Sequence, residues 1–553
     1  RKNYDPATDG FRTAMAGRTV GCEACHGPGR AHAEWRRTHP GGQSAEPGHA
    51  RLTRAQHLDA CGSCHARRTE LTGDFVPGDR FDDHFGLVTV DETDTYHADG
   101  QVRDENYEFG SFAGSRMGAA GVHCLDCHQP HTGKRLLPGD ALCQRCHAAG
   151  LSGAPVIVPS AHTFHRADSP GARCENCHLP QTTYMQRHHR HDHGFTIPDP
   201  ALTRELGIPN ACNRCHDDRD VAWAEEAANR WYGRRLERPT RARARVVAAA
   251  RRGDPGARAG LLELATRTQH PPYWQAVGTR LLAPWAGEPV VRTTLLGLTA
   301  STNARVRVAA LHALGGAVEA GEPVARRTVE SRLADPVRAV RLAAAGTLGP
   351  ALDPASPAGR EFRGFLEFNA DQPLGQLQLG SWHLARRELP AALAHFQKAV
   401  QWDPGSPPFR QQYAVALSQA GRPQEAVAQL REAVRLAPGD APARFQLALG
   451  LGETGTLPAM ITELEAAVRL DPRLARAWYN LGLARSQTGD LEGAVAALLE
   501  GEGVAPGDAD LPYARATLEV RRGAREAARA AAQRALVLRP GWTEAQELLQ
   551  LLR

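Results

Sequence analysis

The cysteines of this chain fall into one repeated pattern, Cys-x-x-Cys-His, which occurs six times and uses all 12 of them. Two thiols at this spacing, followed at once by an imidazole, form the attachment signature of c-type haem. The thiols bond to the haem vinyl groups, and the histidine becomes the proximal iron ligand. The pattern predicts six haem c groups attached through Cys22, Cys25, Cys61, Cys64, Cys124, Cys127, Cys143, Cys146, Cys174, Cys177, Cys212 and Cys215. The predicted proximal ligands are His26, His65, His128, His147, His178 and His216.

Three other uses of paired cysteines compete with this interpretation: disulfide frameworks, zinc ribbons and thioredoxin-like redox centres. None of them requires a histidine directly after every second cysteine. Because all six pairs carry that histidine, the sequence favours haem attachment over each alternative.

The second axial ligand of each haem iron is harder to predict. Methionine is scarce in the motif-bearing segment, where only Met15, Met117 and Met185 occur, whereas 14 histidines lie there outside the motifs. Bis-histidine coordination is therefore expected, and it sets lower potentials than Met/His ligation. The candidate distal ligands are His32, His131, His162, His165 and His193, followed by His97 and His123.

Position in the sequence supports these candidates. His32 follows a Gly-Pro-Gly turn after the first motif, and His131 is so close to the third motif that we expect it to serve a neighbouring haem. His162 and His165 form a pair just before the fifth motif, and His193 is the preferred member of the cluster before the sixth. We expect the remaining histidines to be solvated or non-ligating, and Met117 is an additional axial candidate; the expected non-ligands include His39, His49, His57 and His84.

Bulk composition excludes several functional classes. The formal charge of +5 would be brought close to zero by six ferric haems with ionised propionates, so it gives no support for nucleic-acid binding. No apolar run is long enough to span a bilayer. Haem is attached outside the cytoplasm, so we expect a periplasmic, cell-surface or extracellular protein whose export signal has been cleaved or precedes Arg1.

Histidine marks the division of the chain. Twenty of the 24 histidines lie in residues 1–216, and we predict a hexahaem cytochrome c domain over residues 1–219. This domain should consist of loops and short helices with little conventional core, because the porphyrins would fill its interior.

After residue 219 the composition turns to Ala, Leu, Val, Arg and Glu, and residues 220–234 predict an amphipathic helix. Val306–Gly315 matches Val340–Gly349 at an offset of 34 residues, with Asp335-Pro336 at a turn before the second copy. This pattern predicts HEAT-like helical repeats over residues 220–350.

A linker is predicted over residues 351–372, which contain several prolines and glycines. Beyond it, prolines and glycines recur every 34 residues, which is typical of the tetratricopeptide repeat (TPR). We predict a TPR domain of about five repeats over residues 373–553; the recurring positions are Pro404, Pro438, Pro472, Pro506 and Pro540, and Gly421, Gly455, Gly489 and Gly523. The predicted fold class is mainly α, with an irregular multihaem domain followed by an α-solenoid.

Several segments resemble cytochrome c554-like multihaem proteins. They are Gly21–His32, Asn106–Met117 and Gly121–His131, and the motifs at Cys124 and Cys143 look like the doubled Cys-x-x-Cys-His unit. Asp192–Pro198 and Pro209–His216 are similar to the closing part of bacterial multihaem cytochromes fused to tetratricopeptide repeats.

The resemblance implies a periplasmic or cell-surface electron-transfer protein. It supports His32, His131, His162, His165 and His193 as ligand positions. Such proteins usually carry a signal peptide and a further haem motif upstream, so six haems is a lower limit if the chain continues before Arg1.

Two functions compete. The first is an electron conduit for respiration, in which the helical repeats dock redox protein partners or support assembly into a homo-oligomer or filament. The second is a multihaem reductase of a small nitrogen or sulfur oxyanion, which needs one haem with an open iron position. All six motifs end in histidine and histidines are abundant, which favours the non-catalytic conduit, and no catalytic residue is singled out.

Overall fold

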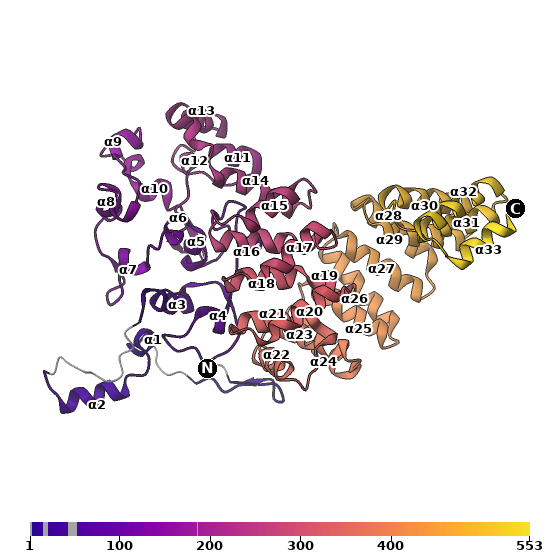
Figure 1. Cartoon of the computed structure of the whole chain (residues 1–553), viewed down its shortest axis with the longest axis horizontal. Coiled ribbons are helices and arrows are strands. Elements are labelled where there is room, and N and C mark those ends of the chain that lie inside the picture. The colour runs from indigo at the N-terminus through magenta and orange to yellow at the C-terminus, as the bar shows by residue number, and fades with distance from the viewer. Residues whose placement is uncertain (1–2, 15–19, 42–51, 185, 553) are drawn as a thin grey trace. The chain divides into compact units, whose positions relative to one another are not determined.

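The computed structural model describes residues 3–14, 20–41, 52–184 and 186–552, and these residues are mainly helical, as the sequence predicts (Figure 1). Contacts divide the chain into two compact units. The first contains Arg1–Asp5 and Gly10–Phe368, and the second contains Pro6–Asp9 and Asn369–Arg553.

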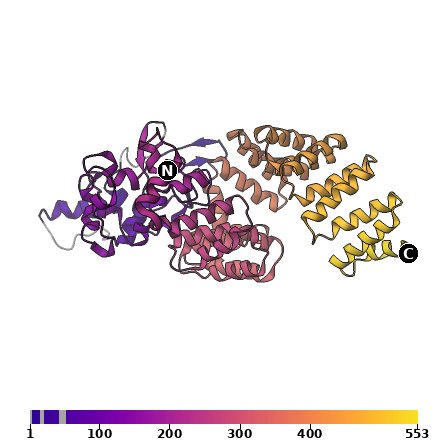
Figure 2. The ribbon, with the colours of Figure 1, turned by 90° about the horizontal axis from the view of Figure 1, so that it is seen from above.

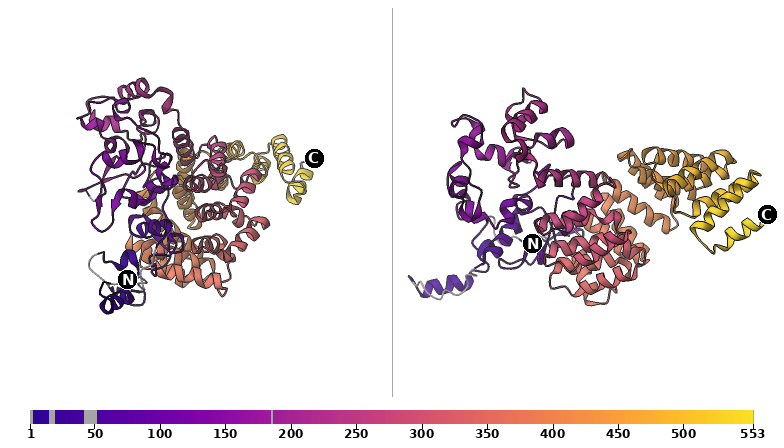
Figure 3. Two further views of the ribbon diagram at one scale, coloured as in Figure 1. Left: turned by 60° about the vertical axis from the view of Figure 1, so that its left-hand side comes forward. Right: turned by 45° about the horizontal axis from the view of Figure 1, so that its top comes forward.

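The motif-bearing part of the first unit consists of short elements and loops, which form the indigo-to-purple ribbon in Figure 3. The strands of its described residues pair in four two-stranded antiparallel sheets: β1 (Tyr4–Asp5) with β2 (Gly10–Phe11), β3 (Arg68–Glu70) with β4 (Phe85–Leu87), β5 (His128–Gln129) with β6 (Lys134–Arg135), and β7 (Gln181–Tyr184) with β8 (His188–His191). Its helices are α1 (Glu23–His26), α2 (Arg30–Thr38), α3 (Arg54–His65), α4 (Phe81–His84), α5 (Glu108–Gly114), α6 (Arg116–Ala119), α7 (Cys124–Cys127), α8 (Ala141–His147), α9 (Pro159–His162), α10 (Cys174–His178), α11 (Pro200–Leu206) and α12 (Ala211–Cys215), with 3₁₀ turns η1 (Leu151–Gly153) and η2 (Pro170–Ala172).

Longer helices follow in the same unit. They are α13 (Val221–Tyr232), α14 (Pro239–Arg251), α15 (Ala257–Thr266), α16 (Pro272–Leu281), α17 (Pro289–Leu298), α18 (Ala304–Ala313), α19 (Gly315–Glu319), α20 (Pro323–Ser331), α21 (Arg338–Leu348) and α22 (Pro357–Phe368), with 3₁₀ turns η3 (Gly233–Leu236), η4 (Ala283–Trp285), η5 (Arg332–Ala334) and η6 (Gly349–Ala351). The helix expected over residues 220–234 is α13, and the two copies of the offset-34 sequence form α18 and α21, which pack together.

A buried ion pair joins those two copies. Arg307 donates two hydrogen bonds of 2.9 Å to the carboxylate of Asp335, and both side chains are at most 10% exposed. Asp335 also accepts a hydrogen bond of 2.9 Å from the backbone N–H of Val337 at the start of α21. The turn expected from Asp335-Pro336 therefore positions the second copy and neutralises Arg307 of the first.

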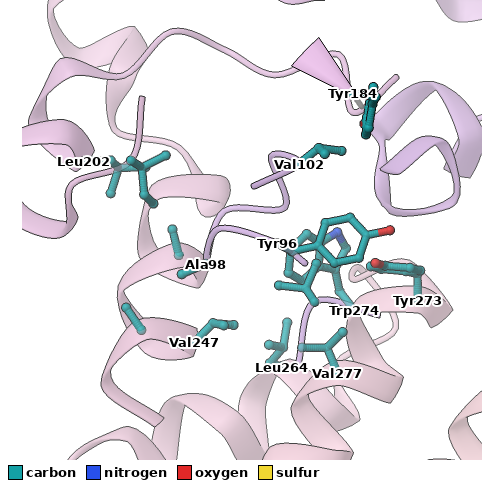
Figure 4. Packing of buried hydrophobic residues seen from close by; sticks show 14 residues of the cluster. Tyr96, Ala98, Val102, Tyr184, Leu202, Val247, Leu264, Tyr273, Trp274 and Val277 are labelled. Carbon is teal, nitrogen blue, oxygen red and sulfur yellow. The ribbon is translucent and has the colours of Figure 1, made fainter. Parts of the chain in front are cut away.

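One hydrophobic core joins the motif-bearing part to the helices that follow it. Seven of its buried residues precede residue 219 and seven follow it (Figure 4). They are Val90, Tyr96, Ala98, Val102, Tyr184, Leu202 and Ile208, and Ala244, Val247, Ala248, Leu264, Tyr273, Trp274 and Val277. The boundary that the sequence suggests at residue 219 thus lies within a shared core.

Trp274 on α16 is the largest fully buried side chain. Its indole N–H donates a 2.7 Å hydrogen bond to the carbonyl of Gly114, and the guanidinium of Arg243 lies 3.6 Å from its ring centre. Gly100 lies against the indole with φ of +100°, where a Cβ would be only 3.1 Å from the ring. The motif-bearing loops therefore close tightly around a residue of the helical part.

Ion pairs strengthen the same junction. Arg241 on α14 binds Asp199 at 2.6 Å, and both side chains are largely buried. Arg280 lies 3.2 Å from the carboxylate of Asp91. Asp82 on α4 binds Arg305 at 2.9 Å.

The segment predicted as a linker, residues 351–372, contains helix α22. Its Glu361 carboxylate accepts hydrogen bonds from Arg341 at 2.6 and 2.8 Å and lies 3.3 Å from Arg338. The hydrogen bond with Arg341 lowers the pKa of Glu361, although burial alone would raise it. This part of the segment packs on α21 and completes the first unit.

The second unit is a series of antiparallel helix pairs, which lie side by side in Figure 2. The helices are α23 (Pro373–Ala385), α24 (Leu389–Trp402), α25 (Pro407–Gln419), α26 (Pro423–Leu436), α27 (Ala441–Glu453), α28 (Leu457–Leu470), α29 (Ala475–Gln487), α30 (Leu491–Val504), α31 (Asp510–Arg521), α32 (Arg525–Leu538) and α33 (Thr543–Leu551). The N-terminal turn that belongs to this unit is bound by Lys398, which lies 2.8 Å from the carboxylate of Asp9.

The recurring glycines have two separate structural roles. Gly421, Gly455, Gly489 and Gly523 lie between the two helices of a pair with φ from 71° to 90°, in the left-handed region that glycine adopts without strain. Gly482 instead allows close packing of α29 on α30, since a Cβ there would lie 2.8 Å from the Leu498 side chain.

The recurring prolines follow the second helix of each pair, and their carbonyl groups are used in the same way in successive repeats. The carbonyls of Pro404, Pro438 and Pro472 accept hydrogen bonds from the side chains of Arg410, Arg444 and Trp478, respectively, at 2.8–3.1 Å. Each contact ties one repeat to the first helix of the next.

The shared core predicts a large effect of truncating Trp274. Trp274→Ala removes the largest buried side chain and its hydrogen bond to Gly114, so it should lower the free energy of unfolding of the first unit by about 3–5 kcal/mol. Chemical denaturation of the full chain would measure this change. Val290→Ala, at a position 67% exposed, is the control and should change stability by less than about 0.5 kcal/mol. Equal effects of the two substitutions would contradict the shared core.

The glycine turns predict that two glycine-to-alanine substitutions in one repeat change stability in opposite directions. Gly489→Ala forces alanine into φ of +90° and should destabilise the second unit by about 1–2 kcal/mol. Gly503→Ala lies in the last turn of α30 with no atom within 4 Å of the added Cβ, and it should stabilise the helix by up to about 1 kcal/mol. Thermal unfolding of the two variants would test the signs, and destabilisation by both would refute the argument.

Candidate functional site

Each Cys-x-x-Cys-His motif lies on, or at the end of, a short helix: α1, the end of α3, α7, α8, α10 and α12. The backbone N–H of His26 bonds to the carbonyl of Cys22, and that of His216 bonds to the carbonyl of Cys212, both at 2.9 Å. Residues three and four apart share one face of a helix. One helical turn therefore places two sulfurs and an imidazole together.

None of the twelve cysteines, all of which lie within the described residues, forms a disulfide, and consecutive motifs bring their side chains close together. The side chain of Cys61 interacts with that of Cys124, and the side chain of Cys143 interacts with that of Cys174. The remaining neighbours in electrostatic contact are Cys25 with Cys61 and Cys64, Cys127 with Cys143 and Cys146, and Cys177 with Cys212 and Cys215. The six motifs thus form a continuous series in the order of the sequence.

Contact between two thiols shifts their pKa values in opposite directions. The contact with Cys124 lowers the pKa of Cys61, while the same contact, together with burial, raises the pKa of Cys124. The Cys143 and Cys174 pair behaves likewise, with the pKa of Cys143 lowered by the contact and that of Cys174 raised.

Four motif histidines face a histidine from outside the motifs. In each pair the ring centres are 6.0–6.3 Å apart, and the ring planes differ by 19–33°. The pairs are His26 with His131, His128 with His193, His178 with His162, and His216 with His165.

This separation fits an iron between the rings. Two imidazoles that bind one metal from opposite sides have ring centres about 6.3 Å apart, because each nitrogen lies about 2 Å from the metal and each ring centre about 1.1 Å behind its nitrogen. Within the described residues, no group of three or more His, Cys, Asp and Glu side chains gathers to hold a bare metal ion. Haem iron takes at most two protein ligands, so the paired histidines suit haem coordination.

Backbone carbonyl groups orient several of these rings. The Nδ1 atom of His178 lies 2.7 Å from the carbonyl of Thr196, and that of His193 lies 2.9 Å from the carbonyl of His191. His165 Nδ1 and the carbonyl of Thr163 are 2.5 Å apart. A proton on Nδ1 in such a bond leaves Nε2 with a lone pair for a metal.

Burial favours the neutral form of four of the eight paired rings. Desolvation lowers the pKa of His128, His162, His178 and His193 below the ordinary value for histidine. A neutral imidazole is the form that binds a metal, so this environment favours ligation.

His65 and His147 differ from the other motif histidines, since no histidine ring faces either of them in the described parts of the chain. His147 Nδ1 lies 2.9 Å from the carbonyl of Pro155. His65 Nδ1 lies 3.4 Å from the carboxylate of Glu108, and this hydrogen bond raises the pKa of His65. The same bond lowers the pKa of Glu108, against the effect of burial.

The other predicted distal ligands lie elsewhere. His123 uses both ring nitrogens, since Nε2 is 2.8 Å from the carbonyl of Arg54 and Nδ1 accepts a hydrogen bond of 3.1 Å from the N–H of Leu125. Its ring contacts His57 edge-on instead of a motif histidine. His97 lies in a loop that lines a cavity of about 400 Å³, and His32 is half-buried on α2.

The residues expected not to bind iron have other contacts. His39 stacks on Trp35, and His84 is buried within 3.2 Å of the carboxylates of Asp74 and Asp79. Met117 lies on α6. His49, Met15 and Met185 lie outside the described residues. Of the histidine cluster, His188 and His189 are exposed on β8.

Aromatic residues of α13 pack on two of the histidine pairs. The hydroxyl group of Tyr232 donates a 2.8 Å hydrogen bond to the carbonyl of His162. Trp231 contacts the ring of His165 edge-on, and Trp223 lies 4.8 Å from the ring of His216, measured between ring centres. Sequence reasoning missed these residues and Glu108, because their contacts depend on packing between segments rather than on a local motif.

Comparison with known proteins identifies only the repeats of the second unit. Residues 383–449 and 475–508 match tetratricopeptide repeat family models, which confirms the TPR prediction for these residues. No curated protein matches the chain. In the described part of the chain, no helix has the length and apolar character needed to cross a membrane.

Several solved TPR structures are similar to this region. MamA from Desulfovibrio magneticus RS-1 is 22% identical over 32% of this chain and 96% of its own, with a TM-score of 0.28. YrrB, described as a TPR protein with an unusual peptide-binding site, is 20% identical over 34% of this chain and 97% of its own, with a TM-score of 0.30. A thermophilic TPR protein from Thermus thermophilus is 21% identical over 32% of this chain and 98% of its own, with a TM-score of 0.26.

Proposed function

We propose that the chain is an exported multihaem c-type cytochrome that transfers electrons through six haem c groups and docks a redox protein partner through its helical repeats. The observation that carries this proposal is the facing of four motif histidines by four other histidines at 6.0–6.3 Å. Each of the four pairs contains one motif histidine, and all four have nearly the same separation. Chance packing of surface side chains would not produce this regularity.

The cysteines and the histidine of each motif would have different roles in holding the haem. The two cysteines tether the haem by thioether bonds, and the histidine binds its iron through Nε2 while Nδ1 keeps its proton on an acceptor such as the carbonyl of Thr196 or Pro155. The haem, when bound, supplies one-electron exchange at iron. The sequential contacts of the cysteine pairs support a series of neighbouring haems rather than isolated ones.

The helical parts would supply the scaffold and the docking surface. We propose HEAT-like repeats over residues 220–350, supported by the packing of α18 on α21 and by the Arg307–Asp335 pair. Tetratricopeptide stacks commonly bind protein segments on their concave surfaces, which supports the docking role. Because thioether attachment takes place outside the cytoplasm, we place the protein in the periplasm or at the cell surface.

A second candidate function is reduction of a small nitrogen or sulfur oxyanion. The observation that favours it is the lack of a facing histidine, within the described residues, at His65 and His147. A haem with one open iron position would bind carbon monoxide when reduced and would give a high-spin ferric signal. Titration of the reduced protein with carbon monoxide would separate the two functions: no binding supports the conduit, and stoichiometric binding supports the reductase.

The pairing of His193 with His128 predicts a selective spectral change. In His193→Ala, all six haems should stay covalently attached, but one should change from low-spin to high-spin because its second axial ligand is lost. Haem content by the pyridine haemochrome method and spin state by electron paramagnetic resonance would measure both. His189→Ala, at an exposed position on neighbouring β8, is the control and should leave the spectrum unchanged. An unchanged spectrum in His193→Ala would refute the pairing.

The division into two units predicts the effect of truncation. A chain ending at Phe368 keeps α22 and the whole first unit, so it should retain the haem content and spectrum of the full chain. It should also lose capture of the redox partner, measured by co-purification from the native host. Loss of haem signals from this shorter chain would show instead that the tetratricopeptide unit is part of the haem scaffold.

A further inference from the structure

The ring of His65 contacts a carboxylate. Its Nδ1 atom lies 3.4 Å from an oxygen of Glu108, on the first residue of α5. By contrast, Nδ1 of His147 and of His178 lies close to a neutral backbone carbonyl. The six motifs are alike in sequence, and this contact distinguishes the second from those of His147 and His178.

Close packing of two helices holds the carboxylate in place. Gly62, inside the second motif on α3, lies against the ring of Phe109, and a Cβ at Gly62 would be 2.8 Å from that ring. Phe109 is buried in a cluster with Phe81, Phe85 and Ala66. Glu108 precedes Phe109 directly, so the contact that fixes Phe109 also directs Glu108 towards His65.

The Glu108 carboxylate is near enough to act electrostatically on more than one histidine. Its side chain is 26% exposed, and its charge acts on His65, His128 and His193. Arg190 is the nearby cation that opposes this effect at His65, and its guanidinium lies over the rings of Tyr107 and Tyr184 at 5.6 and 5.2 Å. Among these groups, Glu108 alone is in hydrogen-bonding reach of His65.

A carboxylate that accepts the Nδ1 proton makes an imidazole a stronger donor to its metal. Stronger donation and a nearby negative charge both stabilise ferric over ferrous iron, which lowers the reduction potential. A neutral carbonyl acceptor has a smaller effect, because hydrogen bonds to ionised acceptors are about twice as strong.

Resting on the proposed function, we propose that Glu108 lowers the reduction potential of the haem held by Cys61, Cys64 and His65, and so sets the second position of the haem series apart from those whose histidines bond to carbonyls. Glu108 acts through His65 and is a positioning residue, not a ligand. An electron arriving at this position would be less stable there than without the Glu108 charge, which favours its onward transfer.

The test uses the full haem-loaded chain and the variant Glu108→Gln, which keeps the size and an acceptor atom but removes the charge. Potentiometric titration followed by visible and electron paramagnetic resonance spectra should show one haem in six whose ferric-to-ferrous equilibrium constant rises at least tenfold, a shift of about 59 mV for one electron. The other five potentials should change much less.

Glu175→Gln is the matched control, because it removes one negative charge inside the fifth motif. Glu175 binds Arg135 at 2.7 Å and not a motif histidine. An equal shift in Glu175→Gln, or no upward shift in Glu108→Gln, would overturn the inference.

A second variant, Glu108→Asp, tests the inference if Glu108→Gln assembles poorly. It keeps the charge but moves it away from His65 by one methylene group, so it should raise the same reduction potential by less than Glu108→Gln does. An unchanged or lower potential would count against the role of Glu108. A native chain without covalent haem would refute both this inference and the proposed function. Six attached haems with potentials that do not respond to Glu108 would refute the inference alone.

Discussion

The facing imidazoles impose the main constraint on the first unit: rings from distant parts of the chain must be kept about 6 Å apart by backbone with few regular elements. Carbonyl groups such as that of Thr196 fix individual rings. They can do so only if the loops that carry them are themselves fixed. The geometry of every histidine pair therefore depends on packing outside the motifs.

The helices after residue 219 provide that packing. Trp274 fills the centre of a core whose other half comes from the motif-bearing loops, and α13 covers two histidine pairs with Trp223, Trp231 and Tyr232. The helical part is thus a structural foundation for the motif-bearing part. Only the repeats after Phe368 form a unit of their own and are available to act as a separate module.

Local patterns in the sequence predicted the local features of the structure. The helical turns at the motifs, α13 and the glycine turns of the tetratricopeptide repeats follow from spacing alone, since each depends on residues a few positions apart. The partner of each motif histidine does not follow from spacing. The sequence predicts His131 and His193 as distal candidates, but which motif each faces depends on tertiary packing. The contact of Glu108 with His65, the shared core around Trp274 and helix α22 escaped prediction because they require segments that are distant in sequence.

The histidine pairs differ widely in the length of chain that separates their members, and this has a consequence for folding. His162 precedes His178 by 16 residues, whereas His26 and His131 are 105 residues apart. Closing a longer loop costs more conformational entropy and is slower. The fifth site can therefore form within a short, continuous stretch of chain, while the first site must close a loop of 105 residues. We expect the fifth site to form early and the first site late.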